Sequence, residues 1–150
     1  MTIWDRFKYI ITNKNFYIPI IICLVLVAFG YFSKITMQNN MKVELFNFFG
    51  MKIDWWSISH LVLYIYFGYH FPQYFVEFLV IGTLWEIFES SFCKESFAKL
   101  IGCQGSNNSF CQKINKIRGC DYWYGKVDDI VVNIIGFVIG AMLAKKFRKN

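Results

Sequence analysis

The sequence contains few charged residues and few prolines for its length. Charged residues make up 17% of the 150 positions and there are 2 prolines, whereas soluble domains contain about 25% charged residues. Hydrophobic residues reach 56% and aromatic residues 21%. Disordered chains have the opposite balance of low hydrophobicity and high charge, so this class is excluded. The composition predicts a membrane protein, and the length predicts a single domain covering residues 1–150.

The charge that is present is mostly positive, with 16 Lys and Arg against 10 Asp and Glu. A net charge of +6 would suit nucleic-acid binding in a soluble protein. Here, however, the basic residues lie beside apolar runs, and four of them form a cluster near the end of the sequence: Lys145, Lys146, Arg148 and Lys149. Such clusters bind anionic lipid headgroups. We therefore expect a membrane and no nucleic-acid partner.

Four apolar runs are close in length to the roughly 20 residues that a transmembrane helix needs. They cover residues 16–33, 55–71, 73–92 and 128–144. Helices satisfy their own backbone hydrogen bonds in lipid, and the sequence shows no strand-like alternation. The predicted fold is an all-α integral membrane protein, a multi-pass four-helix transmembrane bundle with both termini on the cytoplasmic side.

The segments between these runs differ in character. Residues 1–15 are basic and amphipathic, which predicts a helix on the membrane surface. The connector 34–54 contains a segment, Val43–Met51, that we expect to form an interfacial or re-entrant helix. Residues 93–127 form the one long loop.

Four of the five cysteines lie in or beside this loop: Cys93, Cys103, Cys111 and Cys120. Their spacing includes no C-x₂₋₄-C pair, which argues against a zinc site. An even set in one loop predicts two disulfides, in any of three connectivities, on an oxidising side of the membrane. The glycosylation sequon Asn107-Asn108-Ser109 lies in the same loop. We therefore expect a lumenal or extracytoplasmic loop, in the endoplasmic reticulum or another internal membrane.

Several ionisable residues fall in or next to the apolar runs, where a charge costs roughly 2.5–3.5 kcal/mol. Glu86 and Glu89 are three residues apart and share a helix face, as do Asp129 and Asn133, four apart. In a bundle with hairpin connections, the start of the second helix, the end of the third and the start of the fourth lie at one membrane face. The groups expected to meet there are His60, Glu86, Glu89, Asp121, Asp128, Asp129 and Asn133.

Clustered carboxylates repel one another, so a proton or a cation must join them. Carboxylate and amide oxygens suit a hard divalent cation such as calcium, magnesium or manganese. A histidine beside such a site can act as a general base at neutral pH. Metal-assisted attack on a phosphodiester uses these groups.

Each of these residues also has a structural interpretation. His60 can hydrogen-bond to a carbonyl at the membrane interface, and Glu86 and Glu89 can pair with nearby lysines. The two aspartates can cap the last helix, and Asn133 can stabilise packing between helices.

The order of these motifs resembles that of base-exchange phosphatidylserine synthases and, more loosely, of VanZ-like membrane proteins. The resemblance covers residues 54–144. Its matching pieces are Ser59-His60, Trp85-Glu86-Ile87-Phe88-Glu89, Cys120 to Trp123, Asp128 with Asn133, and Gly136 with Gly140. The chain departs from the synthases in its smaller number of spans, in Gly119 where they have an acid before the cysteine, and in Trp123 where they have a second acid.

The resemblance implies a calcium-dependent exchange in which a small hydroxyl acceptor such as serine replaces the choline or ethanolamine of a phospholipid. The implied catalytic residues are His60 and Asp128, and the implied cation ligands are Glu86, Glu89, Asp121 and Asp129. Asn133 and Asn115 are the implied substrate-binding residues. The alternative is a non-enzymatic VanZ-like membrane protein or complex subunit, and the sequence leaves oligomerisation open.

Overall fold

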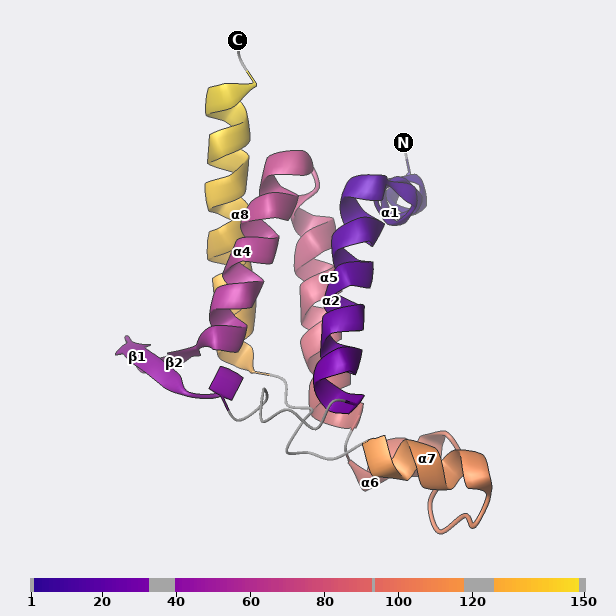
Figure 1. The fold of residues 1–150 in the computed structure, drawn as a ribbon. Coiled ribbons are helices and arrows are strands. Elements are labelled where there is room, and N and C mark those ends of the chain that lie inside the picture. Colours follow the sequence, from indigo (N-terminus) through magenta and orange to yellow (C-terminus); the bar gives the residue numbers. More distant parts are fainter. Residues whose placement is uncertain (1, 33–39, 93, 118–125, 149–150) are drawn as a thin grey trace.

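The computed structural model describes residues 2–32, 40–92, 94–117 and 126–148 (Figure 1). The long helices α2, α4, α5 and α8 lie roughly parallel, α1 crosses one end of this group, and a small β-hairpin projects sideways near the other end. Helices α6 and α7 lie beyond that second end. The elements are α1 (Ile3–Thr12), α2 (Lys14–Phe32), β1 (Glu44–Phe48), β2 (Met51–Asp54), α4 (Trp55–His70), α5 (Phe75–Phe92), α6 (Glu95–Leu100), α7 (Ser109–Ile117) and α8 (Val127–Phe147).

Helices α4 and α8 pack against each other through glycines. A Cβ atom added at Gly140 would lie 2.0 Å from the carbonyl oxygen of Ile65, and one added at Gly68 would lie 2.1 Å from that of Phe137. Gly136, Gly140 and Gly68 therefore allow the backbones of the two helices to come into direct contact.

Aromatic side chains form the core between these helices. The rings of Phe67 on α4 and Phe78 on α5 are 4.8 Å apart, and Phe137 on α8 lies 5.4 Å from Phe78. Phe16 of α2 packs on the same cluster. The core thus joins helices from both halves of the chain, and it lies nearer to the end crossed by α1.

The expected amphipathic helix at the start of the chain is present as α1. Thr2 caps it, because the Thr2 hydroxyl accepts from the Asp5 N–H while the Asp5 carboxylate accepts from the Thr2 N–H. Arg6 donates to both oxygens of the buried Glu77 and, at 2.7 Å, to the carbonyl of Gln73. These contacts fasten α1 to the beginning of α5.

The prediction of four membrane spans is wrong. Among the described helices, only α8 is by itself long and apolar enough to cross a membrane. A second candidate exists only if α1 and Lys14–Leu26, which are bent by 59° relative to each other, are counted together as one span. Helix α4 has 16 residues, about 24 Å, which is shorter than a hydrocarbon core of about 30 Å. Helix α5 carries Glu77, Glu86 and Glu89. The multi-pass topology is therefore not supported, and α8 remains the candidate span.

The prediction of an all-α chain is also wrong, because residues 44–54 form an antiparallel hairpin instead of the expected helix at Val43–Met51. Phe49 and Gly50 both have positive φ, 50° and 84°, which suits the tight turn of a hairpin and cannot continue a helix. The Asn47 side chain accepts a hydrogen bond from the Gly50 N–H at 3.0 Å. Local turn geometry thus overrides the apolar character of this segment.

The described part of the expected long loop contains two short helices, α6 and α7, and one disulfide. Cys103 and Cys111 are bonded, with 5.0 Å between their Cα atoms. Cys93 and Cys120, the other two cysteines of the predicted set, lie outside the described residues. The bond that is present links the end of α6 to the beginning of α7.

Candidate functional site

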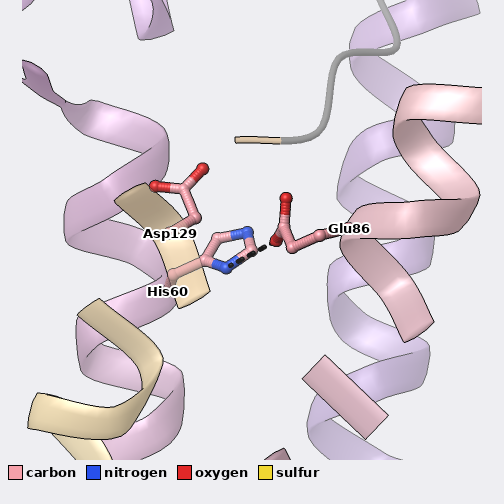
Figure 2. Close-up of side chains that lie close together, drawn as sticks. All are labelled: His60, Glu86 and Asp129. Carbon is pink, nitrogen blue, oxygen red and sulfur yellow. Dashed lines mark ion pairs between the residues drawn. The ribbon is translucent and has the colours of Figure 1, made fainter. Parts of the chain in front are cut away.

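Three ionisable side chains from three helices meet at the end of the bundle near the hairpin. His60 of α4, Glu86 of α5 and Asp129 of α8 each place one possible ligand atom within 4.8 Å of the others. Figure 2 shows the imidazole ring pointing at Glu86, with Asp129 beside it. They meet because α4 and α5 run in opposite directions, so the start of α4, the end of α5 and the start of α8 lie at one level (Figure 1). The expectation that these three residues meet is confirmed.

The orientation of His60 is set by two oxygen atoms. Its Nδ1 atom lies 3.2 Å from Oδ1 of Asn133 and 3.6 Å from Oε1 of Glu86. The Asn133 oxygen can only accept a hydrogen bond, so in this contact Nδ1 donates and Nε2 is left for another partner. This contact fixes the ring orientation and leaves Nε2 as the nitrogen that can act on a ligand.

Glu86 is buried and only partly satisfied. Its Oε2 atom accepts a hydrogen bond from the Lys126 backbone N–H at 2.9 Å, whereas its buried Oε1 atom has no hydrogen-bond partner among the described residues. Burial raises the pKa of Glu86 from 4.5 to about 7. An unsatisfied buried carboxylate oxygen is costly, and either a proton or a bound cation would offset this cost.

Asp129 is supported by a layer of polar residues at the start of α4. The fully buried Ser57 donates its single hydroxyl proton to Asp129, over 2.6 Å. Asp54 caps α4 by accepting the Ser57 N–H at 2.9 Å, and the Lys126 ammonium pairs with Asp54. Asp54 and Asp129 therefore share Ser57 as a neighbour, and Asp54 in addition has the Lys126 ammonium.

Sequence reasoning did not assign site roles to Asp54, Ser57 or Lys126. The spacing Asp54-x-x-Ser57 is a helix N-cap pattern, so it marked the start of α4 without indicating the contact to α8. Lys126 acts on Glu86 through its backbone N–H, for which the sequence carries no signal.

The other predicted residues lie outside this three-residue group. Asp128 faces the hairpin, where its Oδ2 atom accepts from the Lys52 N–H at 3.2 Å. Glu89 lies on a cavity wall outside the three-residue group. Asn115 belongs to α7, which Figure 1 shows away from the bundle, and Asp121 lies outside the described residues.

A cavity of about 430 Å³ opens beside the three-residue group, between α2, α4, α5 and α8. Its lining on α4 runs from Trp56 and His60 to Phe67, and its lining on the antiparallel α5 runs from Glu89 back to Ile81. Both helices therefore place polar groups at one end of the cavity and apolar groups at the other. This shape and polarity suit an amphipathic ligand.

The donor set fits a divalent cation. Glu86 and Asp129 supply carboxylate oxygens, and Oε1 of Glu86 lacks another partner among the described residues. Hard cations such as calcium prefer oxygen ligands, and calcium takes six to eight of them, so substrate or water oxygens would complete the shell. His60 is close enough to act on a ligand held there.

Comparison of the chain with family models, with curated proteins and with solved structures finds no match. The resemblance to phosphatidylserine synthases and VanZ-like proteins thus stays a prediction from the sequence motifs.

Proposed function

We propose that the chain is a membrane-attached enzyme that exchanges the headgroup of a phospholipid, with His60 as general base and with Glu86 and Asp129 holding a divalent cation. The observation that carries the proposal is that His60 contacts Asn133 and lies in the three-residue group, and that it also lines the polar end of an otherwise apolar cavity. A phospholipid has the same division between an acyl chain and a charged headgroup.

The substrate class follows from the cavity. Its volume of about 430 Å³ falls in the range of about 300–1,000 Å³ that is typical of small-molecule sites. Leu63, Phe67 and Ile81 line the part that would receive an acyl chain. The phosphodiester would then lie next to His60 and Asn133.

The proposed chemistry is attack of a hydroxyl acceptor, such as serine, on the lipid phosphorus. A divalent cation would supply charge stabilisation for the phosphate oxygens. Nε2 of His60 takes the acceptor proton as the new P–O bond forms, and Asn133 holds the ring through Nδ1. The bond to the original headgroup oxygen breaks, and His60 returns the proton to the departing choline or ethanolamine.

The membrane placement in this proposal uses α8 as the span. Lys145 and Lys146 lie in the last turn of α8, which suits a cytoplasmic end. The Cys103–Cys111 disulfide comes before the first residue of α8 in the sequence. A disulfide suits an oxidising lumen. We therefore assign the site to the lumenal side of an internal membrane.

The test is lipid turnover by the purified full-length chain in phospholipid vesicles with labelled serine and either calcium or manganese. We expect His60→Ala to lower exchange by about 10²–10⁴-fold, the usual contribution of a general base. The matched control is His70→Ala, because His70 lies at the opposite end of α4 and should keep full activity.

Cation binding is measured separately, as the rise in melting temperature when the cation is added. We expect the melting temperature to rise with the cation in the wild type and in His60→Ala, and not in Glu86→Gln. The control is Glu44→Gln on the exposed strand β1, which should keep the rise. A wild-type protein that shows neither turnover with serine, choline or ethanolamine nor a cation-dependent rise would contradict the proposal and favour a non-enzymatic subunit.

A further inference from the structure

The hairpin carries three aromatic side chains that are at least half exposed in the described part of the chain. Phe49, at the turn, is 91% exposed, and Phe46 and Phe48 on β1 are each 52% exposed. The rings of Phe48 and Phe49 contact each other edge to face, 4.7 Å apart. We call these three residues the aromatic tip.

The backbone at the tip is unusual for a phenylalanine. Phe49 has a φ of 50°, a conformation that bulky side chains rarely adopt and that Asn or Gly favour in hairpin turns. The turn therefore presents a large apolar ring at a position where a small polar residue would fit better. Turn stability does not explain this choice of residue.

The hairpin is fastened to the beginning of the candidate span. The Lys52 N–H donates to Asp128 at 3.2 Å, and the Lys126 ammonium donates to the carbonyl of Lys52 and pairs with Asp54. Figure 1 shows the hairpin projecting sideways at the level where α8 begins. If α8 crosses a bilayer, the hairpin lies along the membrane surface on that side.

We propose that the aromatic tip inserts into the bilayer interface on the side where α8 begins. Aromatic residues are enriched at this depth of a membrane, and the half-exposed Trp55 lies at the same end of the bundle. Insertion would place His60 and Glu86 at headgroup depth, because Asp54 and Lys126 connect the hairpin to Glu86. The inference rests on the membrane placement of α8 in the proposed function.

The experiment uses single tryptophan substitutions in the full chain, reconstituted in phosphatidylcholine bilayers with or without bromine on the acyl chains. Bromine quenches tryptophan emission on contact, and quenching beyond that of the wild type reports the new residue. Phe49→Trp is the test position, with Phe48→Trp as a second tip position that does not depend on the turn. Met142→Trp, 66% exposed on α8, tests the span, and Leu100→Trp, 81% exposed on α6, is the control outside the membrane.

We expect added quenching at positions 49, 48 and 142 and none at position 100. Quenching at 142 with none at either tip position would overturn tip insertion and leave the membrane placement intact. Absence of quenching at 142 would overturn the membrane placement and the inference with it. If tryptophan emission at the tip is blue-shifted and unquenched, the tip contacts protein, such as a second copy of the chain. This result would also overturn tip insertion.

Discussion

Glu89 is a partly buried acid on the wall of the cavity. Its pKa is raised from 4.5 to about 8, first because burial disfavours the charged form and then because Glu86 and Asp129 repel it. Between these two pH values the folded protein keeps a proton that the unfolded chain has lost. Stability must therefore fall as the pH rises through this window.

We predict that the free energy of unfolding, measured with urea and with a chelator present, falls between pH 5 and pH 8, and that Glu89→Gln reduces the slope. One proton contributes at most ~1.4 kcal/mol per pH unit. Glu44→Gln makes the same charge change on the exposed strand β1 and should leave the slope as it is in the wild type. Identical pH profiles for the wild type and Glu89→Gln would contradict the prediction.

At the scale of elements, the contact between α4 and α8 holds the site together, because it places His60 next to Asp129 and Asn133. Glycines allow the two backbones to touch. The atoms nearest a Cβ at Gly140 belong to the backbone of α4, including the Ile65 carbonyl oxygen at 2.0 Å and the Tyr69 nitrogen at 2.7 Å. Backbone atoms cannot rotate away as the end of a side chain can.

Gly140→Ala should destabilise the protein, although the same change in a helix interior normally stabilises by up to about 1 kcal/mol. Overpacking typically costs about 1–3 kcal/mol, and we expect a loss of about 2 kcal/mol in urea unfolding. Met142→Ala on the exposed face of α8 is the control and should change stability by less than about 0.5 kcal/mol. A more stable Gly140→Ala variant would show that the two helices are not in direct backbone contact.

At the scale of the whole molecule, the ion pair between Arg6 and the buried Glu77 joins the N-terminal helix to the bundle. Removing one partner of such a pair leaves an uncompensated charge in the interior, which costs about 3–5 kcal/mol when both groups are buried. Arg6 is partly exposed, so water reduces this cost.

We predict that Arg6→Met lowers the free energy of unfolding by roughly 2–3 kcal/mol. The double variant Arg6→Met with Glu77→Gln should recover most of this loss, because the buried charge is then gone. Urea unfolding of the wild type, both single variants and the double variant gives the coupling between the two sites. Additive losses would mean that the pair does not connect α1 to α5.

Local patterns predicted part of the fold and most of the central site. The meeting of His60, Glu86 and Asp129 followed from the order of the helices and from short connections that reverse the chain. The aspartates could not be told apart in this way, because Asp128 and Asp129 differ by one residue, or about 100° around the helix. Their roles, one toward the hairpin and one toward Ser57, depend on what packs against each face.

The sequence by itself determined the long helices and the gathering of His60, Glu86 and Asp129 at one end, because these depend on apolar runs and on order along the chain. Tertiary structure decided how the hairpin contacts the beginning of α8, and it decided the cavity with its polar end. Its contacts also decided which oxygen of Glu86 is left without a hydrogen bond among the described residues. The physical reason is that burial and hydrogen bonding depend on residues distant in sequence, such as Lys126 and Glu86, whose contact no local pattern specifies.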